Sequence, residues 1–537
     1  MTKTASSSTF FFWLTVAAGL CLLYPQIDFQ GFLSSGDHGR GLYAAERTLH
    51  GDVPYQDYWW DYGPLMPYYY AAFDHLLGVN IMSILIAKAL LTLASAMCIF
   101  LTLEVLAGGL AGFAAAAWFL AFGHDFFYTY NHAGGITCLA FTLFCVASYI
   151  KTRQDDWLWT GLVGAFILSL IKLNFGAAAI LMLLGTACLT DLSFAVPFTG
   201  KKKFFYLFGT ILLPLIILAV YWSFLYGLSW AELQQCMPFG RSDALFQSSP
   251  WEALNLLAKT FGQNLLANRT DFIFGAIVLT SLLRVLSQLA DRERPAAERK
   301  ESLLTLILLG ACYILSLHEY IKSDLWYRTF WAQPAGIVWM FALVALALKN
   351  FSLLIRALIF GLLCILCTLH AREYLAKIDI YRTTDHYLAD PRGKVFIANP
   401  PEWMKTAEDT AEFINRMIPP DETFLALPYD PLYYYLTARR SPTRMLTFFD
   451  VIHIPPEQEM KVINELENSR VNFILLSNRI HSQEPGLGIF GQTYCPNIAK
   501  YIDANFIPVA KFGDWQNEPG WAWNHGTVIL QRKGLRK

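Results

Sequence analysis

The chain has 537 residues, of which 55% are apolar and only 15% are charged, and its mean hydropathy is +0.37. Soluble proteins carry about 25% charged residues, so this composition excludes a simple soluble enzyme. The formal net charge of −1 gives no electrostatic support to a nucleic-acid partner, and we expect none.

The charged residues are unevenly distributed along the chain. Residues 1–369 contain 44 of them, whereas the 168 residues of 370–537 contain 39. A low density of charge is typical of a membrane-embedded segment, and a higher one of a water-soluble domain that can bury its own core. We therefore predict a transmembrane body over residues 1–369, with a first outer loop over 28–81, and a soluble domain over 370–537.

A helix of about 20 mostly apolar residues can cross a bilayer. The sequence offers about eleven such segments, at residues 9–27, 82–104, 109–123, 133–150, 157–171, 175–190, 204–226, 271–290, 302–317, 329–348 and 352–370. The fifth and sixth are short and are separated by Lys172, Asn174 and Gly176, so we expect half-length helices that meet inside the membrane.

Basic residues gather in the loops on one side of these segments, for example at Lys201 to Lys203 and at Arg292, Arg294 and Arg299. By the positive-inside rule this side is cytoplasmic. The loop over 28–81 and the domain over 370–537 then lie on the opposite side.

The last third alternates strand-like and helix-like runs. Strands are expected at 395–398, 423–427, 471–476 and 527–531, and helices at 407–417, 431–436 and 457–468. This alternation predicts a small α/β domain outside the cytoplasm.

The loop over 28–81 holds the densest cluster of polar residues before that domain. Asp37 comes just after the first span, so its carboxylate should lie at the membrane surface, where it can accept a proton or hold a cation. A structural role is the alternative, in which Asp37 caps a short helix over 42–49 or pairs with Arg40, and spacing alone favours that role.

Residues Gly36 to Asp57, GDHGRGLYAAERTLHGDVPYQD, are followed by the step Gly63-Pro64-Leu65 before the second span. This pattern resembles the first outer loop of the GT-C glycosyltransferases. It is most similar to the protein mannosyltransferase and aminoarabinose transferase branch, which includes bacterial transferases that act on lipid A and on the lipopolysaccharide core.

The resemblance implies a GT-C fold of about eleven transmembrane helices and an inverting enzyme. Such an enzyme moves a monosaccharide from a polyprenyl-phosphate donor to lipid A, core oligosaccharide, another glycan or a protein. It also implies a bacterial inner membrane, with the N-terminus in the cytoplasm and the active site in the periplasm. A lipid or polysaccharide transporter and a non-catalytic relative are the alternatives.

On this resemblance, Asp37 is the base that deprotonates the acceptor. Asp125, in the next outer loop, is a second catalytic candidate, although an exposed loop carboxylate is as good an interpretation. Asp37, Asp125 and His124 could together hold a divalent metal ion, but their spacing is no ligand signature, so a metal cofactor is left open.

Three cations are candidates for the donor phosphate. Lys88 and Lys172 fall within or between predicted spans, where a charge is costly and therefore a functional hypothesis, and Arg328 stands just before the tenth span. The alternative for both lysines is that they extend to the interface. Residues that could contact the acceptor or the sugar are His38, Arg40, Tyr43, Tyr55 and Asn131.

Overall fold

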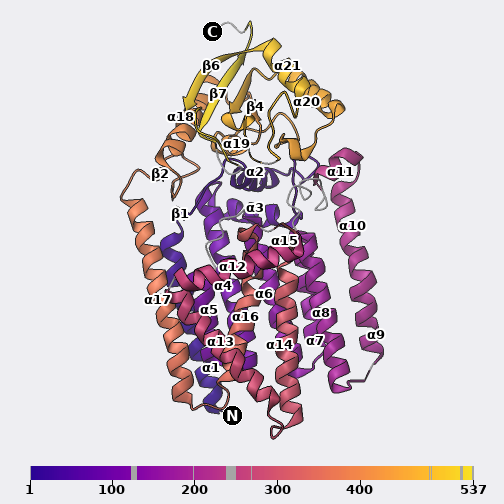
Figure 1. Cartoon of the computed structure of the whole chain (residues 1–537). Helices are drawn as coiled ribbons and strands as arrows, with labels where there is room; N and C mark the ends of the chain where they lie inside the picture. Colours follow the sequence, from indigo (N-terminus) through magenta and orange to yellow (C-terminus); the bar gives the residue numbers. More distant parts are fainter. Residues whose placement is uncertain are drawn as a thin grey trace.

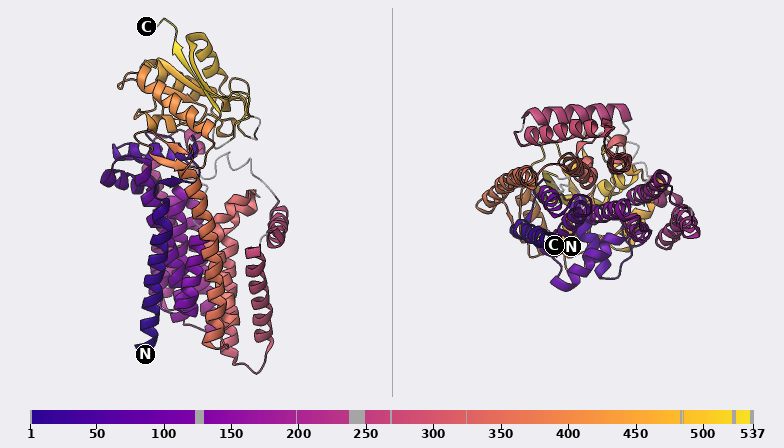
Figure 2. Two further views of the ribbon diagram at one scale, coloured as in Figure 1. Left: turned by 90° about the vertical axis from the view of Figure 1, so that its left-hand side faces the viewer. Right: turned by 90° about the horizontal axis from the view of Figure 1, so that it is seen from below.

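The computed structural model describes residues 2–122, 130–197, 199–236, 249–267, 269–323, 325–482, 484, 486–520 and 524–534. Long helices form a bundle, and the C-terminal domain is stacked on one end of it (Figure 1). A second view shows the same two layers, with α1 (Thr2–Leu23) beginning at the end of the bundle that is far from the C-terminal domain (Figure 2).

Within the described residues, eight segments are long and apolar enough to cross a membrane. They are Ser8–Gln26 in α1 and the turn after it, Ile81–Ala107 (α4), Asn131–Thr152 (α6), Leu173–Phe194 (α8), Gly200–Leu225, Arg269–Ala290 (α13), Tyr327–Ala347 and Leu353–Arg382 (α17). Two shorter apolar helices are α5 (Gly109–Phe122) and α7 (Asp156–Ile171), and α14 (Ala296–Ser316) packs against α8. Every predicted span falls on a helix, which confirms a multispan helical membrane protein.

Besides Ser8–Gln26, which ends in a 3₁₀ turn (Tyr24–Gln26), two of these segments are not uniform helices. Gly200–Leu225 consists of α9 (Gly200–Leu207), a π-helical turn (Phe208–Leu212) and α10 (Leu213–Leu225). Tyr327–Ala347 begins in the 3₁₀ helix η4 (Trp326–Ala332) and continues as α16 (Gln333–Ala347). Helices outside these segments are the short α11 (Trp230–Cys236) and α15 (His318–Ser323) and the longer α12 (Pro250–Ala267).

The predicted break between the fifth and sixth spans is present at Lys172. This residue is extended, with φ −152° and ψ 106°, between the end of α7 and the start of α8. The carbonyl of Ile171 that the break frees accepts hydrogen bonds from Gly63 N, at 2.9 Å, and from Asn131 Nδ2, at 3.2 Å. The expected pair of half-length helices is wrong in one respect, because α8 runs for 22 residues.

The first outer loop forms strand β1 (Phe29–Gln30) and helices α2 (Asp37–Leu49) and α3 (Leu65–Leu77). The helix expected over 42–49 therefore begins five residues earlier, with Asp37 in its first turn. A carboxylate there is favoured by the partial positive charge of the helix N-terminus. Most of α2 is buried, because it lies between α3 and the C-terminal domain (Figure 1).

The C-terminal domain contains the predicted α/β arrangement. A four-stranded mixed sheet has the order β4 (Phe424–Leu427), β5 (Phe473–Ser477), β7 (Gly526–Arg532) and β6 (Phe506–Gly513), with β4 and β5 parallel and the other pairs antiparallel. Its helices are α18 (Pro401–Met417), α19 (Leu432–Leu436), α20 (Pro456–Asn468) and α21 (Pro496–Asn505). The strand β6 and the helix α21 have no counterpart in the predicted elements.

The C-terminal domain is attached to the first outer loop as well as to α17. Strand β1 pairs in parallel with β3 (Val395–Ile397), and β2 (Tyr387–Leu388) pairs antiparallel with β3 on its other side. A Cβ on Gly39 would lie 2.4 Å from Leu432 N, so only glycine allows α2 this close approach. The predicted domain boundary at residue 369 lies inside α17, which continues to Arg382.

Candidate active site

A cavity of about 370 Å³ lies where the bundle, the first outer loop and the C-terminal domain meet. The loop contributes Asp37, Arg40, Trp59, Asp61, Tyr62 and Gly63, and the bundle contributes His132, Lys172, Asn174, Tyr221, Glu319 and Arg328 among others. Tyr429, Thr447, Val451 and Ile452 come from the C-terminal domain. Three parts of the chain that are distant in sequence therefore enclose one space.

Arg40 is the central cation on the loop side. Its guanidinium lies 2.6 Å from Asp61 Oδ1 and 3.5 Å from Asp37 Oδ1, and its side chain is only 3% exposed. The group also packs over four aromatic rings, those of Trp59, Trp60, Tyr62 and Tyr429, at 5.0 to 5.9 Å from the ring centres. Arg40 is therefore held rigidly, and Asp61 is its closer partner.

Asp37 is partly exposed, as is Asp61 at 32%, but it has a second partner besides Arg40. Its Oδ1 accepts a hydrogen bond of 2.8 Å from the hydroxyl of Tyr429, and its side chain is 26% exposed. Burial raises the pKa of Tyr429 well above its ordinary value, so the hydroxyl stays protonated and can donate. Burial also raises the pKa of Asp61, although the charge of Arg40 opposes that effect. The cavity thus holds two carboxylates in different surroundings.

Lys172 lies on the bundle side of the same cavity. Its Nζ is 2.7 Å from Glu319 Oε1, and it packs over the rings of Tyr62, Phe175 and Trp331 at 5.1 to 5.6 Å. Both partners of the ion pair are mostly buried, with 15% and 13% of their side chains exposed. The ring of Tyr62 therefore contacts both Arg40 and Lys172.

Arg328 lines the cavity from η4 and acts on the same acidic group. Burial alone would raise the pKa of Glu319, but the charges of Lys172 and Arg328 bring it below its ordinary value. Glu319 is therefore ionised at neutral pH. A lysine and an arginine near one point are suited to hold a phosphate group.

Four of the predicted sugar or acceptor contacts do not line the cavity. His38 bonds through Nδ1 to Ser34, Tyr43 accepts from Ser441 N at 2.8 Å, and Tyr55 donates to the carbonyl of Tyr62. Asn131 supports the break at Ile171 as described above. All four are buried, so the structure gives them packing roles, and of this predicted group Arg40 alone lines the cavity.

Lys88 lies on α4 and also does not line the cavity. Its charge acts on His38. Burial, together with the charges of Lys88 and Arg40, lowers the pKa of His38 to about 3. Lys88 is therefore close to the first outer loop. Its role toward a donor phosphate stays a prediction.

The second catalytic candidate, Asp125, and the metal candidate His124 fall outside the described residues. Over the described ranges, no group of three or more His, Cys, Asp or Glu side chains is arranged to hold a metal ion. The metal site suggested for Asp37, Asp125 and His124 stays a prediction.

Among the cavity residues that were not selected from the sequence are Asp61, Glu319 and Tyr429, which contact Arg40, Lys172 and Asp37. Asp61 stands two residues before the Gly63-Pro64-Leu65 step, and this position in the sequence could have identified it as a candidate. Glu319 and Tyr429 come from segments far from the loop and carry no local signal, since only the tertiary fold brings them to Lys172 and Asp37.

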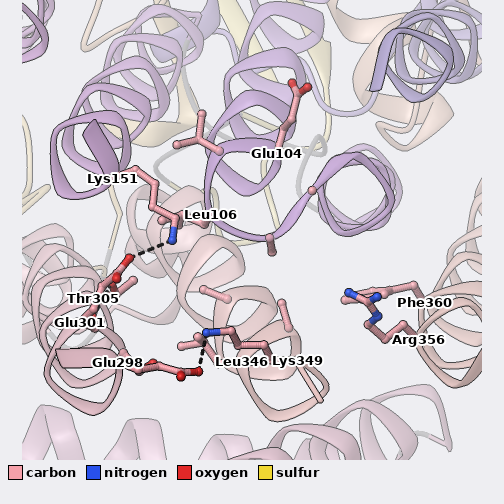
Figure 3. Close-up of a pocket in the computed structure, with 16 residues that line it drawn as sticks. Glu104, Leu106, Lys151, Glu298, Glu301, Thr305, Leu346, Lys349, Arg356 and Phe360 are labelled. Carbon is pink, nitrogen blue, oxygen red and sulfur yellow. Dashed lines mark hydrogen bonds and ion pairs between the residues drawn. The ribbon is translucent and has the colours of Figure 1, made fainter. Parts of the chain in front are cut away.

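A second cavity, of about 280 Å³, lies at the opposite end of the bundle. Its charged side chains include two ion pairs, Lys151 with Glu301 at 2.8 Å and Lys349 with Glu298 at 2.6 Å (Figure 3). The pairs connect α6 and the turn that follows α16 to α14, and their side chains are 37–52% exposed. We interpret them as connections between helix ends rather than as a reaction site.

Comparison with solved structures places this geometry in a known architecture. The chain is similar to ArnT from Cupriavidus metallidurans bound to undecaprenyl phosphate, with 12% identity, a TM-score of 0.56 and 98% of each chain covered. The apo form of ArnT gives 13% identity, a TM-score of 0.56 and coverage of 97% of this chain and 98% of that one.

The mycobacterial arabinofuranosyltransferase AftD is 14% identical over 97% of this chain and 40% of its own, with a TM-score of 0.49. No family model and no curated protein matches the chain. The ArnT similarity spans both the bundle and the C-terminal domain, and it agrees with the helices found for the predicted spans. The chain therefore has the fold of ArnT, which is the GT-C fold.

Proposed function

We propose that the chain is an inverting membrane glycosyltransferase that moves a monosaccharide from a polyprenyl-phosphate donor to an acceptor hydroxyl. One observation carries the proposal: a partly exposed carboxylate, Asp37, and two cations, Lys172 and Arg328, line the same cavity. A carboxylate can remove the acceptor proton, and cations can hold the phosphate that leaves.

The reaction forms one bond and breaks one. The acceptor oxygen attacks the anomeric carbon of the sugar from the side opposite the phosphate, and its proton passes to Asp37. The bond between the anomeric carbon and the phosphate oxygen breaks, and the phosphate takes the electron pair. A phosphodiester with one negative charge thus becomes a phosphate monoester with two, and the positive groups of the cavity stabilise the added charge.

The surroundings of Asp37 suit a base. Arg40 is committed to Asp61 at 2.6 Å, so at 3.5 Å it orients Asp37 without neutralising it fully. Tyr429 and Arg40 both approach Oδ1, and within the described residues Oδ2 makes no hydrogen bond. Oδ2 is therefore the oxygen that we assign to the acceptor proton.

The donor is proposed from the chemistry of the cavity and from the fold. Lys172 and Arg328 favour an anionic group, and the ArnT structure of the same fold contains undecaprenyl phosphate. We propose a polyprenyl-phosphate monosaccharide as donor, held in the bilayer. The acceptor candidates are lipid A, core oligosaccharide, another glycan or a protein, outside the inner membrane of a bacterium.

The test is a transfer assay on the full chain in lipid nanodiscs, with radiolabelled polyprenyl-phosphate sugars and a panel of acceptors. Asp37→Asn keeps the size and the contacts of the side chain but removes its basicity. We expect it to reduce transfer by about 100-fold or more while the donor still binds. Equal rates for the wild type and Asp37→Asn would contradict the assignment.

The matched control is Asp57→Asn. Asp57 belongs to the same loop, is exposed and accepts a hydrogen bond from Val53 N, and it does not line the cavity. Transfer by this variant should stay close to wild type. Lys88→Ala is tested for donor binding in the same nanodiscs. An unchanged affinity for the donor would favour the alternative, in which Lys88 extends to the membrane interface.

A further inference from the structure

The cavity contains an acidic residue that the transfer scheme does not use. Glu319 forms an ion pair with Lys172, the lysine that is proposed to hold the donor phosphate. We propose that Glu319 is a product-release residue: its carboxylate pairs with Lys172 when no lipid phosphate is bound, and it repels the doubly charged prenyl phosphate that transfer leaves behind. This inference rests on the proposed function.

Glu319 and a lipid phosphate would compete for the same partner. Lys172 Nζ is 2.7 Å from Glu319 Oε1, which is a direct ion pair, and both side chains are mostly buried. A phosphate that reaches Lys172 must displace this carboxylate or lie beside it. In a site with little water either arrangement has a cost, because like charges repel strongly there.

The position of Glu319 is fixed by its neighbours. Asn174 Nδ2 donates to Glu319 Oε1 at 2.9 Å and lies 2.9 Å from His318 Nε2. His318 Nδ1 bonds to the carbonyl of Leu315 at 2.8 Å, which leaves Nε2 as the acceptor. The carboxylate is therefore held beside Lys172 by Asn174, which His318 orients in turn.

The charge of Glu319 distinguishes donor from product. The donor is a phosphodiester with one negative charge, whereas the product is a monoester whose second pKa is near 6, so it carries close to two charges at pH 7. Cations alone would therefore bind the product more tightly than the donor and keep it in the site. The Glu319 carboxylate repels the doubly charged product about twice as strongly as the singly charged donor. This repulsion offsets the tighter binding of the product by the cations.

The proposal is tested by binding to the full chain in nanodiscs, with two non-reacting probes. One is farnesyl phosphate, a monoester, and the other is farnesyl methyl phosphate, a diester with one charge. Glu319→Gln keeps an oxygen toward Lys172 and Asn174 but removes the charge. We expect the monoester to bind at least about tenfold more tightly to this variant, and the diester to gain less.

The control is Glu301→Gln, which removes the charge from an ion pair of similar length, 2.8 Å to Lys151, outside the cavity. It should leave the affinity for both probes unchanged. Monoester binding that is unchanged or weaker in Glu319→Gln would overturn the proposal. So would an equal gain for monoester and diester, because Glu319 would then not discriminate by charge.

Glu319→Asp separates a charge effect from a packing effect. It retains the carboxylate, so the wild-type ratio of monoester to diester affinity should be preserved even if the fold is slightly weakened. In steady-state transfer, Glu319→Gln should lower kcat and strengthen inhibition by the prenyl phosphate product, with a smaller change in KM. If no transfer is detected for any protein, the proposed function fails, while the binding ratio still decides whether Glu319 discriminates.

Discussion

The hydroxyl of Tyr429 donates a hydrogen bond of 2.8 Å to Oδ1 of Asp37, a residue 392 positions earlier in the chain. The C-terminal domain thereby supplies a side chain that orients the candidate base in the first outer loop. The backbone carbonyl of Tyr429 accepts in turn from the buried Arg479 at 2.8 Å. The C-terminal domain is therefore part of the candidate site and not only a neighbour of it.

Tyr429→Phe tests this relationship. The ring remains to pack against Trp59 and Arg40, but the charged carboxylate of Asp37 loses the hydrogen bond that the hydroxyl donates. We expect transfer to fall by about tenfold, less than for Asp37→Asn. Tyr494→Phe is the control, because Tyr494 is a buried tyrosine of the same domain whose hydroxyl has no partner among the described residues. An equal effect of the two substitutions would exclude an orienting role for Tyr429.

The first outer loop approaches the break at Lys172 so closely that Gly63 should not tolerate a side chain. A Cβ on Gly63 would lie 2.1 Å from the carbonyl oxygen of Leu170, so Gly63→Ala must displace the backbone beside Lys172. We expect Gly63→Ala to lower the Tm and to reduce transfer by about tenfold or more. Gly185→Ala, in α8, meets no atom within 4 Å and should leave both quantities near wild type.

Two neighbouring lysines at the far end of the bundle should differ in their effect on stability. Lys202 is 3% exposed and lies 2.6 Å from Asp191, whereas Lys201 is 56% exposed and pairs with Asp156 at 3.0 Å. Lys202→Met leaves the mostly buried carboxylate of Asp191 with the hydrogen bond from Tyr149 but without its cation, and we expect it to lower the free energy of unfolding by about 2–4 kcal/mol. Lys201→Met should change it by less than about 1 kcal/mol. Denaturant unfolding of both variants measures the difference, and similar values would refute it.

His38 predicts a dependence of stability on pH. In the unfolded chain its ring takes up a proton near pH 6.5, but in the fold its pKa is lowered to about 3. Between these values the unfolded state binds more protons, so His38 makes the protein less stable as the pH falls, by up to about 1.4 kcal/mol per pH unit.

The His38→Asn variant should therefore lose less stability than the wild type between pH 6 and pH 4. The asparagine side chain can still accept the hydrogen bond from Ser34 N, and it does not titrate in this pH range. His75→Asn, on the exposed face of α3, should follow the wild-type curve. Parallel curves for His38→Asn and wild type would contradict the assigned burial effect.

Much of the architecture could be predicted from the sequence because it depends on local pattern. Apolar length alone located the eight segments of the described residues that are long and apolar enough to cross a membrane, and the break at Lys172 followed from a charge within an apolar run. The strands β4, β5 and β7 were predicted because their runs are apolar. The strand β6 was missed because it is an edge strand with Pro508 in it and mostly exposed side chains, which leaves no pattern to detect.

The candidate site was predictable in part. Asp37, Arg40, Lys172 and Arg328 were selected, and all four line the cavity. His38, Tyr43 and Tyr55 belong to the same loop pattern, but their side chains are buried, the first two on α2 and Tyr55 against Tyr62 and Phe224. A motif in sequence does not separate residues that face the cavity from residues that support it, since both kinds lie on one short helix and its flanks.

The sequence by itself determined that the chain lies in two solvents, which segments cross the membrane, and that one loop carries a carboxylate beside the first span. Only the tertiary structure decided what that carboxylate meets. The contacts of Asp37 with Tyr429 and of Lys172 with Glu319 join segments that share no periodicity and no local propensity. They form because packing the C-terminal domain and α15 against the loop and the bundle brings these groups together, and such packing is a property of the whole chain.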